Sequence, residues 1–197
     1  MELNYYELFA VIFGFIAVYF NTQENVLGWP TGIIGVVLSG IVFFEAKLYS
    51  DLALHVIYVI LGFYGWYEWL YGGKNKSELK VSTLARSLLV VLIVLGALGT
   101  FGIGYFFATY TDADLAYWDA FTTAYSLVGQ YMLARKKIEN WMLWIIVDTV
   151  ASGIYIYKEL YLLALLYFLY LGLATYGYLN WKKSMAKYQD AGGIRQT

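Results

Sequence analysis

The sequence predicts an all-α polytopic membrane protein with seven transmembrane helices. Of its 197 residues, 61% are hydrophobic and only 14% are charged, whereas a soluble domain is roughly 45–50% apolar and about 25% charged. A mean hydropathy of +0.59 and a single proline favour long apolar helices. These values exclude a soluble globular enzyme and a disordered protein.

Seven segments have the length of a transmembrane helix, which is about 20 mostly apolar residues. They lie at residues 5–21, 26–45, 52–71, 84–108, 118–134, 140–157 and 160–181. Several are short or contain polar residues, as expected of helices that other helices screen from lipid. Trp69, Trp118 and Trp181 lie near segment ends, where we expect an aromatic belt at the membrane surface.

The first three segments carry local signals. The first lacks the basic start of a signal peptide and has Glu7 there instead, so we expect it to be retained. The second has Pro30 in its first turn, where a missing N–H group is tolerated. Its Gly28 and Gly32 form a small-residue face for helix packing. In the third, Glu68 is interpreted as structural.

Lysine and arginine are distributed unequally between the two sides of the predicted helices. Eleven of the thirteen lie in the loops after the first, third and fifth helices or in the C-terminal tail, and only Lys47 and Lys158 lie on the other side. The positive-inside rule therefore predicts an outer N-terminus and a cytoplasmic C-terminus. The net charge of −1 gives no footprint for nucleic acid.

The chain contains an internal repeat with an offset of 112 residues. Aligning residues 29–69 with 141–181 gives eleven identities in 41 ungapped positions. The matches include two tryptophan pairs, Trp29 with Trp141 and Trp69 with Trp181, which a biased apolar composition does not readily produce. The repeat pairs the second and third helices with the sixth and seventh, and by extension the first with the fifth.

The repeat predicts a 3+1+3 arrangement. Three helices are an odd number, so a linking fourth helix is needed to give both halves the same orientation. We expect a first bundle at 1–71, a linker with the fourth helix at 72–110, a second bundle at 111–181 and a tail at 182–197. Gly96, Gly99 and Gly102 form a packing ridge on the linking helix. Parallel repeats of this kind are a transporter architecture.

Polar and aromatic residues line one face of the sixth segment. Steps of three and four place them together, and they are Asn140, Trp141, Trp144, Asp148, Ser152 and Tyr155. Asp148 lies roughly 12 Å along the helix from Asn140, a depth at which a carboxylate needs a wet cavity or a partner. We interpret this face as a cation-attracting site with tryptophan walls. The alternatives are a structural Asp148 and an interfacial Trp141.

The fifth segment carries a second polar face, in which Thr122, Ser126 and Gln130 recur at four-residue spacing. Their hydroxyls and amide can bind polar groups of a ligand, or can instead join helices to one another. Trp29 is the repeat counterpart of Trp141 and is predicted to line the opposite wall. The tyrosines of the seventh segment, Tyr167, Tyr170 and Tyr176, suit either a core or a cavity.

Several function classes are disfavoured by what the sequence lacks. The absence of cysteine excludes disulfides, thiolate metal sites and cysteine nucleophiles, and the single histidine disfavours a histidine-based catalytic or metal centre, so we expect no catalytic residue, metal or cofactor. A receptor or scaffold is disfavoured by the two polar faces. The classes that remain are a uniporter for a cationic aromatic solute and a proton-coupled sugar or nucleoside transporter, in which Asp148 would carry the proton.

The residues resemble the PnuC family of bacterial vitamin transporters. The resemblance covers most of residues 25–181, and its most specific segments are FFEAKLYSD, GWYEW and ENWMLW. It implies a SWEET-like fold, a homotrimer in the bacterial inner membrane and facilitated diffusion of a vitamin. It also implies a cytoplasmic kinase that traps the vitamin after entry. Membrane lipids are expected to surround the transporter.

The resemblance leaves the vitamin open. The name-giving members carry nicotinamide riboside, and similar members carry thiamine, riboflavin or deoxynucleosides. Two features raise the thiamine reading: the chain is short, and Asp148 stands where some nicotinamide riboside carriers have asparagine. Nicotinamide riboside and thiamine both carry a fixed positive charge on an aromatic ring, which tryptophan stacking and a carboxylate would suit.

Overall fold

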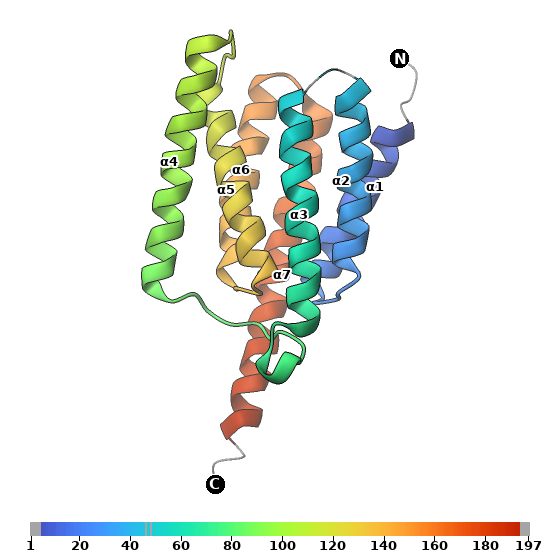
Figure 1. Ribbon diagram of the computed structural model, residues 1–197, viewed down its shortest axis with the longest axis vertical. Helices are drawn as coiled ribbons and strands as arrows, with labels where there is room; N and C mark the ends of the chain where they lie inside the picture. Colours follow the sequence, from blue (N-terminus) through green and yellow to red (C-terminus); the bar gives the residue numbers. More distant parts are fainter. Residues whose placement is uncertain (1–4, 46, 48, 194–197) are drawn as a thin grey trace. The chain divides into compact units, whose positions relative to one another are not determined.

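The computed structural model describes residues 5–45, 47 and 49–193, and these form seven α-helices and one short 3-10 helix (Figure 1). The helices are α1 (Tyr5–Thr22), α2 (Gly28–Glu45), α3 (Tyr49–Tyr71), α4 (Arg86–Tyr110), α5 (Ala116–Ala134), α6 (Glu139–Tyr157) and α7 (Tyr161–Gly193), with η1 (Lys74–Lys76) after α3. The seven predicted helices are therefore confirmed. Only α7 departs much from its predicted bounds, because it continues through the basic segment after Trp181.

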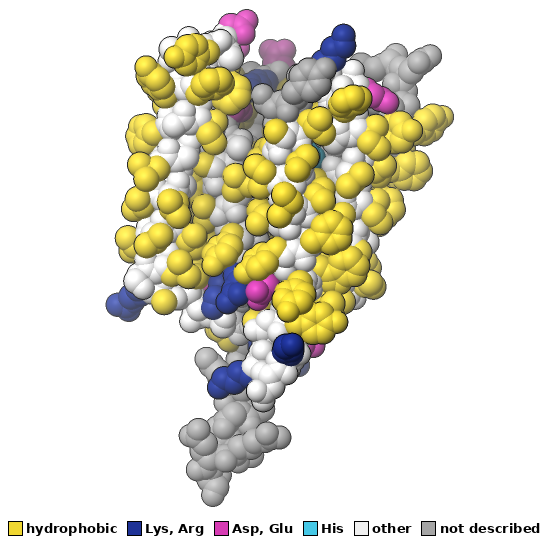
Figure 2. Space-filling view, in the orientation of Figure 1, with side chains coloured by type: hydrophobic (Ala, Val, Ile, Leu, Met, Phe, Trp, Pro, Cys, Tyr) yellow, Lys and Arg dark blue, Asp and Glu magenta, His cyan; other side chains and the backbone are white. Residues whose placement is uncertain are grey.

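Four of the helices are long and apolar enough to cross a membrane by themselves: α1, α2, α4 and residues Tyr161–Lys187 of α7. α3, α5 and α6 have 23, 19 and 19 residues but carry more polar side chains. Apolar side chains cover much of the visible helix surface, and charged ones gather near helix ends (Figure 2). The protein is a multi-pass membrane protein.

The chain divides into two compact units. Unit 1 contains α1, α2 and α3, the turn residues 134–136 and α7 from Leu179 onward. Unit 2 contains Ser82–Leu133, with α4 and most of α5, and Lys137–Tyr178, with α6 and the first part of α7.

The 112-residue offset recurs in the backbone. Adding 112 to the bounds of α1 and α2 gives those of α5 and α6 to within one residue, and adding it to the start of α3 gives the start of α7. Left-handed non-glycine residues recur with the same offset. Glu24 has φ 55° and Lys136 has φ 45°, while Lys47 has φ 59° and Glu159 has φ 57°. Because this conformation costs a non-glycine residue about 1–2 kcal/mol, its recurrence indicates that corresponding helix connections have the same form.

In unit 1, α1 and α2 pack closely through small residues. A Cβ atom on Gly35 would lie 3.1 Å from the backbone nitrogen of Gly14 and 3.2 Å from the carbonyl oxygen of Ala10. A Cβ atom on Gly28 would collide with the side chain of Asn21. The predicted close packing is therefore confirmed at Gly28, whereas a Cβ atom on Gly32 would make only an ordinary contact, 3.4 Å from the Cβ of Ala17.

A buried tryptophan cluster, formed by Trp29, Trp69 and Trp181, occupies the interior of unit 1. The Trp69 ring lies 5.5 Å from Trp29 and 5.8 Å from Trp181 between centroids. Trp69 is 1% exposed and Trp181 is 0% exposed, so their expected place in a membrane-surface belt was wrong. Trp181 Nε1 instead donates a hydrogen bond to the carbonyl oxygen of Asn21 at 3.0 Å. Trp118 is exposed, as a belt residue would be.

The side chain of Lys136 is buried beside this cluster. Its Nζ lies 4.5 Å from the centroid of the Trp69 ring and 3.5 Å from both Glu24 Oε2 and Glu78 Oε1. Arg135 makes a separate ion pair of 2.9 Å with Glu68. Glu24 and Lys136 are repeat counterparts, so equivalent residues of the two helix connections carry opposite charges and contact each other.

In unit 2, α4 packs on α5 through glycines. A Cβ atom on Gly96 would lie 2.8 Å from Cζ of Tyr125, and one on Gly99 would lie 3.1 Å from the Cβ of Ala124. The third residue of the predicted ridge, Gly102, has open space instead. The Tyr125 hydroxyl donates to the carbonyl oxygen of Ile93 at 3.0 Å, which ties the two helices together.

Candidate substrate site

The α6 face predicted from the sequence is largely buried in unit 2. Asn140 is 0% exposed, Asp148 4% and Ser152 3%. Trp141 is also buried, whereas Trp144 and Tyr155 are half-buried. α6 follows α5 after a short connection, residues 135–138, in which Lys137 N donates a hydrogen bond to Met132 O at 2.9 Å.

Asn140 and Ser152 each place on this face a polar atom that is buried without a hydrogen-bond partner among the described residues. Asn140 Nδ2 donates to the carbonyl oxygen of Lys137 at 2.6 Å, but Asn140 Oδ1 has no donor. The Ser152 hydroxyl has no partner either. Buried polar groups are nearly always hydrogen-bonded, so Asn140 Oδ1 and Ser152 Oγ are available to a ligand or to water.

Asp148 lies between these two residues along α6. In the described part of the chain no ion pair joins its carboxylate to a basic side chain. Tyr155 lies seven residues after it on the same face of α6 and contacts Tyr167 of α7, with the ring centroids 5.1 Å apart. A buried carboxylate attracts a cation more strongly than a solvated one does, since a low dielectric weakens the screening.

The two tryptophans of α6 lie against glycines of neighbouring helices. A Cβ atom on Gly177 of α7 would lie 2.7 Å from Cε2 and Cζ2 of Trp141. A Cβ atom on Gly129 of α5 would lie 3.1 Å from Cε2 of Trp144. Each indole therefore occupies a position that any larger residue would obstruct. Gly129 follows Ser126 by three positions and so lies next to it on the helix surface, which places the Trp144 indole beside the polar face of α5.

The α5 face consists of half-buried Thr122, Ser126 and Gln130. The Thr122 hydroxyl donates to the carbonyl oxygen of Asp119 at 2.9 Å, which leaves only its acceptor capacity for a ligand. Asp119 itself pairs with Lys158 at 3.0 Å. Ser126 and Gln130 are therefore the better hydrogen-bonding candidates of this helix.

Eight of the nine predicted site residues belong to unit 2, and the ninth, Trp29, belongs to unit 1. Trp29 is 2% exposed, and its ring lies over Gly65 of α3 and against Trp69. This contact repeats the packing of Trp141 on Gly177, because both residues of the pair are shifted by 112 positions. Trp29 Nε1 has no hydrogen-bond partner among the described residues.

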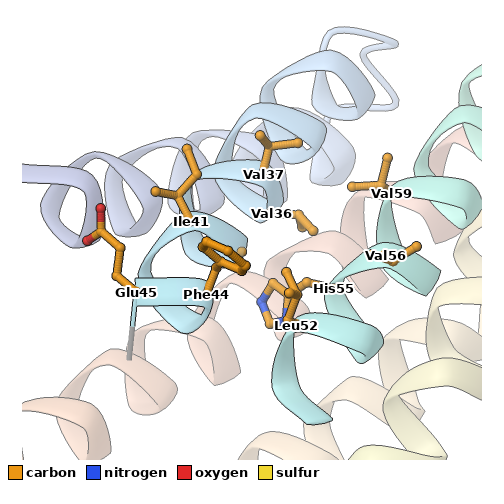
Figure 3. A pocket seen from close by; sticks show the side chains of 10 residues that line it. Val36, Val37, Ile41, Phe44, Glu45, Leu52, His55, Val56 and Val59 are labelled. Carbon is orange, nitrogen blue, oxygen red and sulfur yellow. The ribbon is translucent and has the colours of Figure 1, made fainter. Parts of the chain in front are cut away.

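Unit 1 has a groove of about 420 Å³ between α2 and α3, which the sequence reasoning did not anticipate (Figure 3). The groove is lined by Val36 and Gly40 of α2 and by His55 of α3, together with Phe44 and Glu45 at the C-terminal end of α2. Its apolar residues follow ordinary helical spacing, so nothing in the sequence separates them from lipid-facing residues.

Polar helix faces that are buried inside a multi-pass membrane protein are typical of membrane transporters. The comparison with known families agrees. Residues 4–183 match the family described as "Nicotinamide mononucleotide transporter", and the chain belongs to this family. It is a transporter family and not one of enzymes.

Relatives with stated activities match over most of the chain. The "Nicotinamide riboside transporter PnuC" of Escherichia coli (strain K12) is 28% identical, over 93% of this chain and 87% of the relative. The PnuC of Neisseria mucosa is 26% identical, over 91% of this chain and 72% of its own. The "Riboflavin/roseoflavin transporter RibM" of Streptomyces davaonensis is 26% identical, over 86% of this chain and 81% of the relative.

The fold is similar to that in the "Crystal structure of the Vitamin B3 transporter PnuC". The TM-score is 0.73 at 24% sequence identity, and the match covers 93% of this chain and 83% of that one. At this identity the likeness establishes the all-helical transporter fold.

Proposed function

We propose that the chain takes up a cationic aromatic vitamin, nicotinamide riboside, across the bacterial inner membrane by facilitated diffusion. The observation that carries this proposal is the α6 face, where the buried carboxylate of Asp148 lies between unpartnered polar atoms of Asn140 and Ser152. A flat ring with a fixed positive charge matches a carboxylate flanked by indoles. The relatives that transport nicotinamide riboside support the same substrate.

In this proposal each part of the site has a separate task. Trp144 stacks on the ring and Trp141 closes one side. Asp148 balances the positive charge, while Ser126, Gln130 and Asn140 hydrogen-bond the ribose and the carboxamide. Thr122 and Tyr155 complete the proposed lining of this site in unit 2.

We further infer alternating access between two parallel three-helix repeats joined by α4, in a SWEET-like 3+1+3 arrangement. The coincidence of helix bounds and left-handed turns at an offset of 112 supports the repeat. The proposed orientation, with the N-terminus outside, rests on the distribution of basic residues. It concerns chain ends, before Tyr5 and after Gly193, that lie outside the described residues. A homotrimer and a cytoplasmic kinase that traps the vitamin are part of the same proposal.

Thiamine is the second candidate substrate. It too has a cationic aromatic ring, and the carboxylate of Asp148 would balance the fixed charge of that ring. A proton-coupled nucleoside or sugar transporter is a weaker alternative, in which the same carboxylate would carry the proton.

Calorimetric binding to the purified protein tests the substrate, using nicotinamide riboside, thiamine, riboflavin and uridine. Preferred binding of nicotinamide riboside is expected. A preference for thiamine would show that the proposed substrate is wrong and would leave the proposed mechanism intact. Binding of uridine alone would refute the proposal that the site selects a cation. A reporter fused after Thr197 is expected on the cytoplasmic side, and a periplasmic reporter would contradict the orientation.

A further inference from the structure

Three aromatic rings contact one another in sequence in each unit, although the first pair is inclined at 62° in unit 1 and at 39° in unit 2. In unit 1, the Phe43 and His55 rings lie 4.7 Å apart, and His55 and Tyr58 lie 6.0 Å apart at 85°. In unit 2, the Tyr155 and Tyr167 rings lie 5.1 Å apart. Tyr167 and Tyr170 lie 5.8 Å apart at 87°. Each ring of the second group lies 112 positions after its counterpart, so the repeat extends to these side-chain contacts.

The surroundings of the two ring groups differ in chemistry. In unit 1, the repeat counterparts of Asp148 and Ser152 are Val36 and Gly40, which line the apolar groove of Figure 3 together with His55. In unit 2, the corresponding positions present a buried carboxylate and a buried hydroxyl without a partner. The ring contacts recur in both units, but a carboxylate and a hydroxyl in unit 2 stand where unit 1 has Val36 and Gly40.

We propose that Tyr155, Tyr167 and Tyr170 form an aromatic cage that, with Asp148, selects a solute by the positive charge on its ring. The proposal assigns Tyr167 and Tyr170 as specificity-determining residues and rests on the proposed function of the same site. The cage is held by two helices: Asp148, Ser152 and Tyr155 share one face of α6 at steps of four and three. Tyr167 and Tyr170 share one face of α7.

The physical reason lies in the electron distribution of the ring. The face of a phenol ring is negative, so several faces around one point attract a cation and contribute nothing comparable to a neutral ring of the same shape. A nearby carboxylate also attracts the cation through its full negative charge. Phenol rings alone would also admit neutral aromatic solutes, and a carboxylate alone would also admit metal ions. Together they favour an organic cation.

The test compares two solutes that differ in ring charge. Nicotinamide riboside has a cationic ring, and its 1,4-dihydro form has the same skeleton without the charge. Affinities of the full-length purified protein for both are measured by calorimetry, and the quantity of interest is the ratio of the two. Wild type is expected to prefer the cation. Tyr167→Leu and Tyr170→Leu are each expected to lower this ratio about three- to thirtyfold.

The repeat supplies a matched control. Tyr58→Leu removes the counterpart of Tyr170 from unit 1, where Val36 stands in place of the carboxylate, and is expected to leave the ratio within about twofold of wild type. Tyr170→Phe keeps the ring face and is expected to retain the preference. If Tyr167→Leu does not fold, Tyr167→His introduces the side chain that unit 1 has at this position, and it is expected to lower the ratio as well.

The outcomes separate the cage from the proposed function. If wild type prefers the cationic form but the two leucine variants keep that preference, or if Tyr58→Leu lowers it equally, the cage is refuted and the transport proposal stands. If wild type binds neither form but binds thiamine, the substrate is wrong. In that case the cage requires Tyr167→Leu and Tyr170→Leu to weaken thiamine binding, with Tyr58→Leu unaffected. If wild type binds no cationic ring, both proposals fall.

Discussion

Replacing Gly177 by alanine tests how closely the Trp141 indole packs on α7. The new Cβ atom would lie 2.7 Å from Cε2 and Cζ2 and 2.8 Å from Cδ2 of Trp141, whereas carbon atoms in contact lie about 3.5–4.0 Å apart. The indole must therefore move by about 1 Å. It is buried, so overpacking is expected to cost about 1–3 kcal/mol.

The control is another glycine of the same helix. Gly172 has no neighbouring atom within 4 Å of its hypothetical Cβ, so Gly172→Ala receives only the gain in helix propensity, up to about 1 kcal/mol. Both variants share this gain, and the difference between them isolates the contact with Trp141. Using about 2–4 °C per kcal/mol for a chain of this size, the melting temperature of Gly177→Ala is expected to lie roughly 2–12 °C below that of Gly172→Ala.

Thermal unfolding of the purified protein in detergent, followed by circular dichroism, provides the measurement. Trp141→Phe in the Gly177→Ala background makes room for the new methyl group and is expected to recover part of the loss. Equal melting temperatures for the two alanine variants would refute the close contact. Gly65→Ala is expected to repeat the effect in unit 1, because its Cβ would collide with the Trp29 ring.

Other predictions concern the buried lysine, the candidate site and the energetics of transport. Lys136→Met leaves Glu24 without its cation and is expected to lower the free energy of unfolding by about 1–3 kcal/mol, while Lys74→Met, at an exposed lysine, is expected to change it by less than about 0.5 kcal/mol. Similar denaturation midpoints would contradict this. Trp144→Ala is expected to weaken nicotinamide riboside binding several-fold to about thirtyfold, and unchanged calorimetric affinity would exclude stacking. Asp148→Asn should weaken binding of the cationic ring more than that of its dihydro form, and equal effects would indicate a structural aspartate. In empty proteoliposomes, uptake should stop at equal concentrations on both sides, and accumulation driven by a proton or sodium gradient would rule out facilitated diffusion.

The helices and the repeat could be predicted from the sequence because their signals are local or additive. Long apolar segments predict helices whatever they pack against. The repeat emerges from matches such as Tyr64–Gly65 with Tyr176–Gly177, which the structure connects to one contact, an indole lying on a glycine. The polar α6 face could also be predicted from a local signal, because steps of three and four determine which residues share a helix face.

Other features depend on tertiary packing. A tryptophan near a helix end is compatible both with a belt at the membrane surface and with a buried cluster. The predicted place of Trp69 and Trp181 in a belt was therefore wrong. Lys136 was counted only as one of several cytoplasmic charges, because two neighbouring basic residues conceal it in the sequence. Tyr167 and Tyr170 remained ambiguous, since tyrosine suits lipid, core and cavity alike. The ring contact with Tyr155 connects Tyr167 to the site, and Tyr170 is connected through its ring contact with Tyr167.

The contact between Glu24 and Lys136 influences which repeat of a duplicated chain pairs with which. Two identical copies of an ancestral three-helix repeat would bring two like residues together at this point, and two glutamates or two lysines there would repel. With opposite charges, each repeat is matched to the other and mismatched to a second copy of itself. A chain assembled from two first repeats would bring two carboxylates together, so the divergence at these two positions disfavours pairing between identical halves. Exchanging the charges, as in Glu24→Lys with Lys136→Glu, should preserve this selectivity, whereas either substitution alone should abolish it.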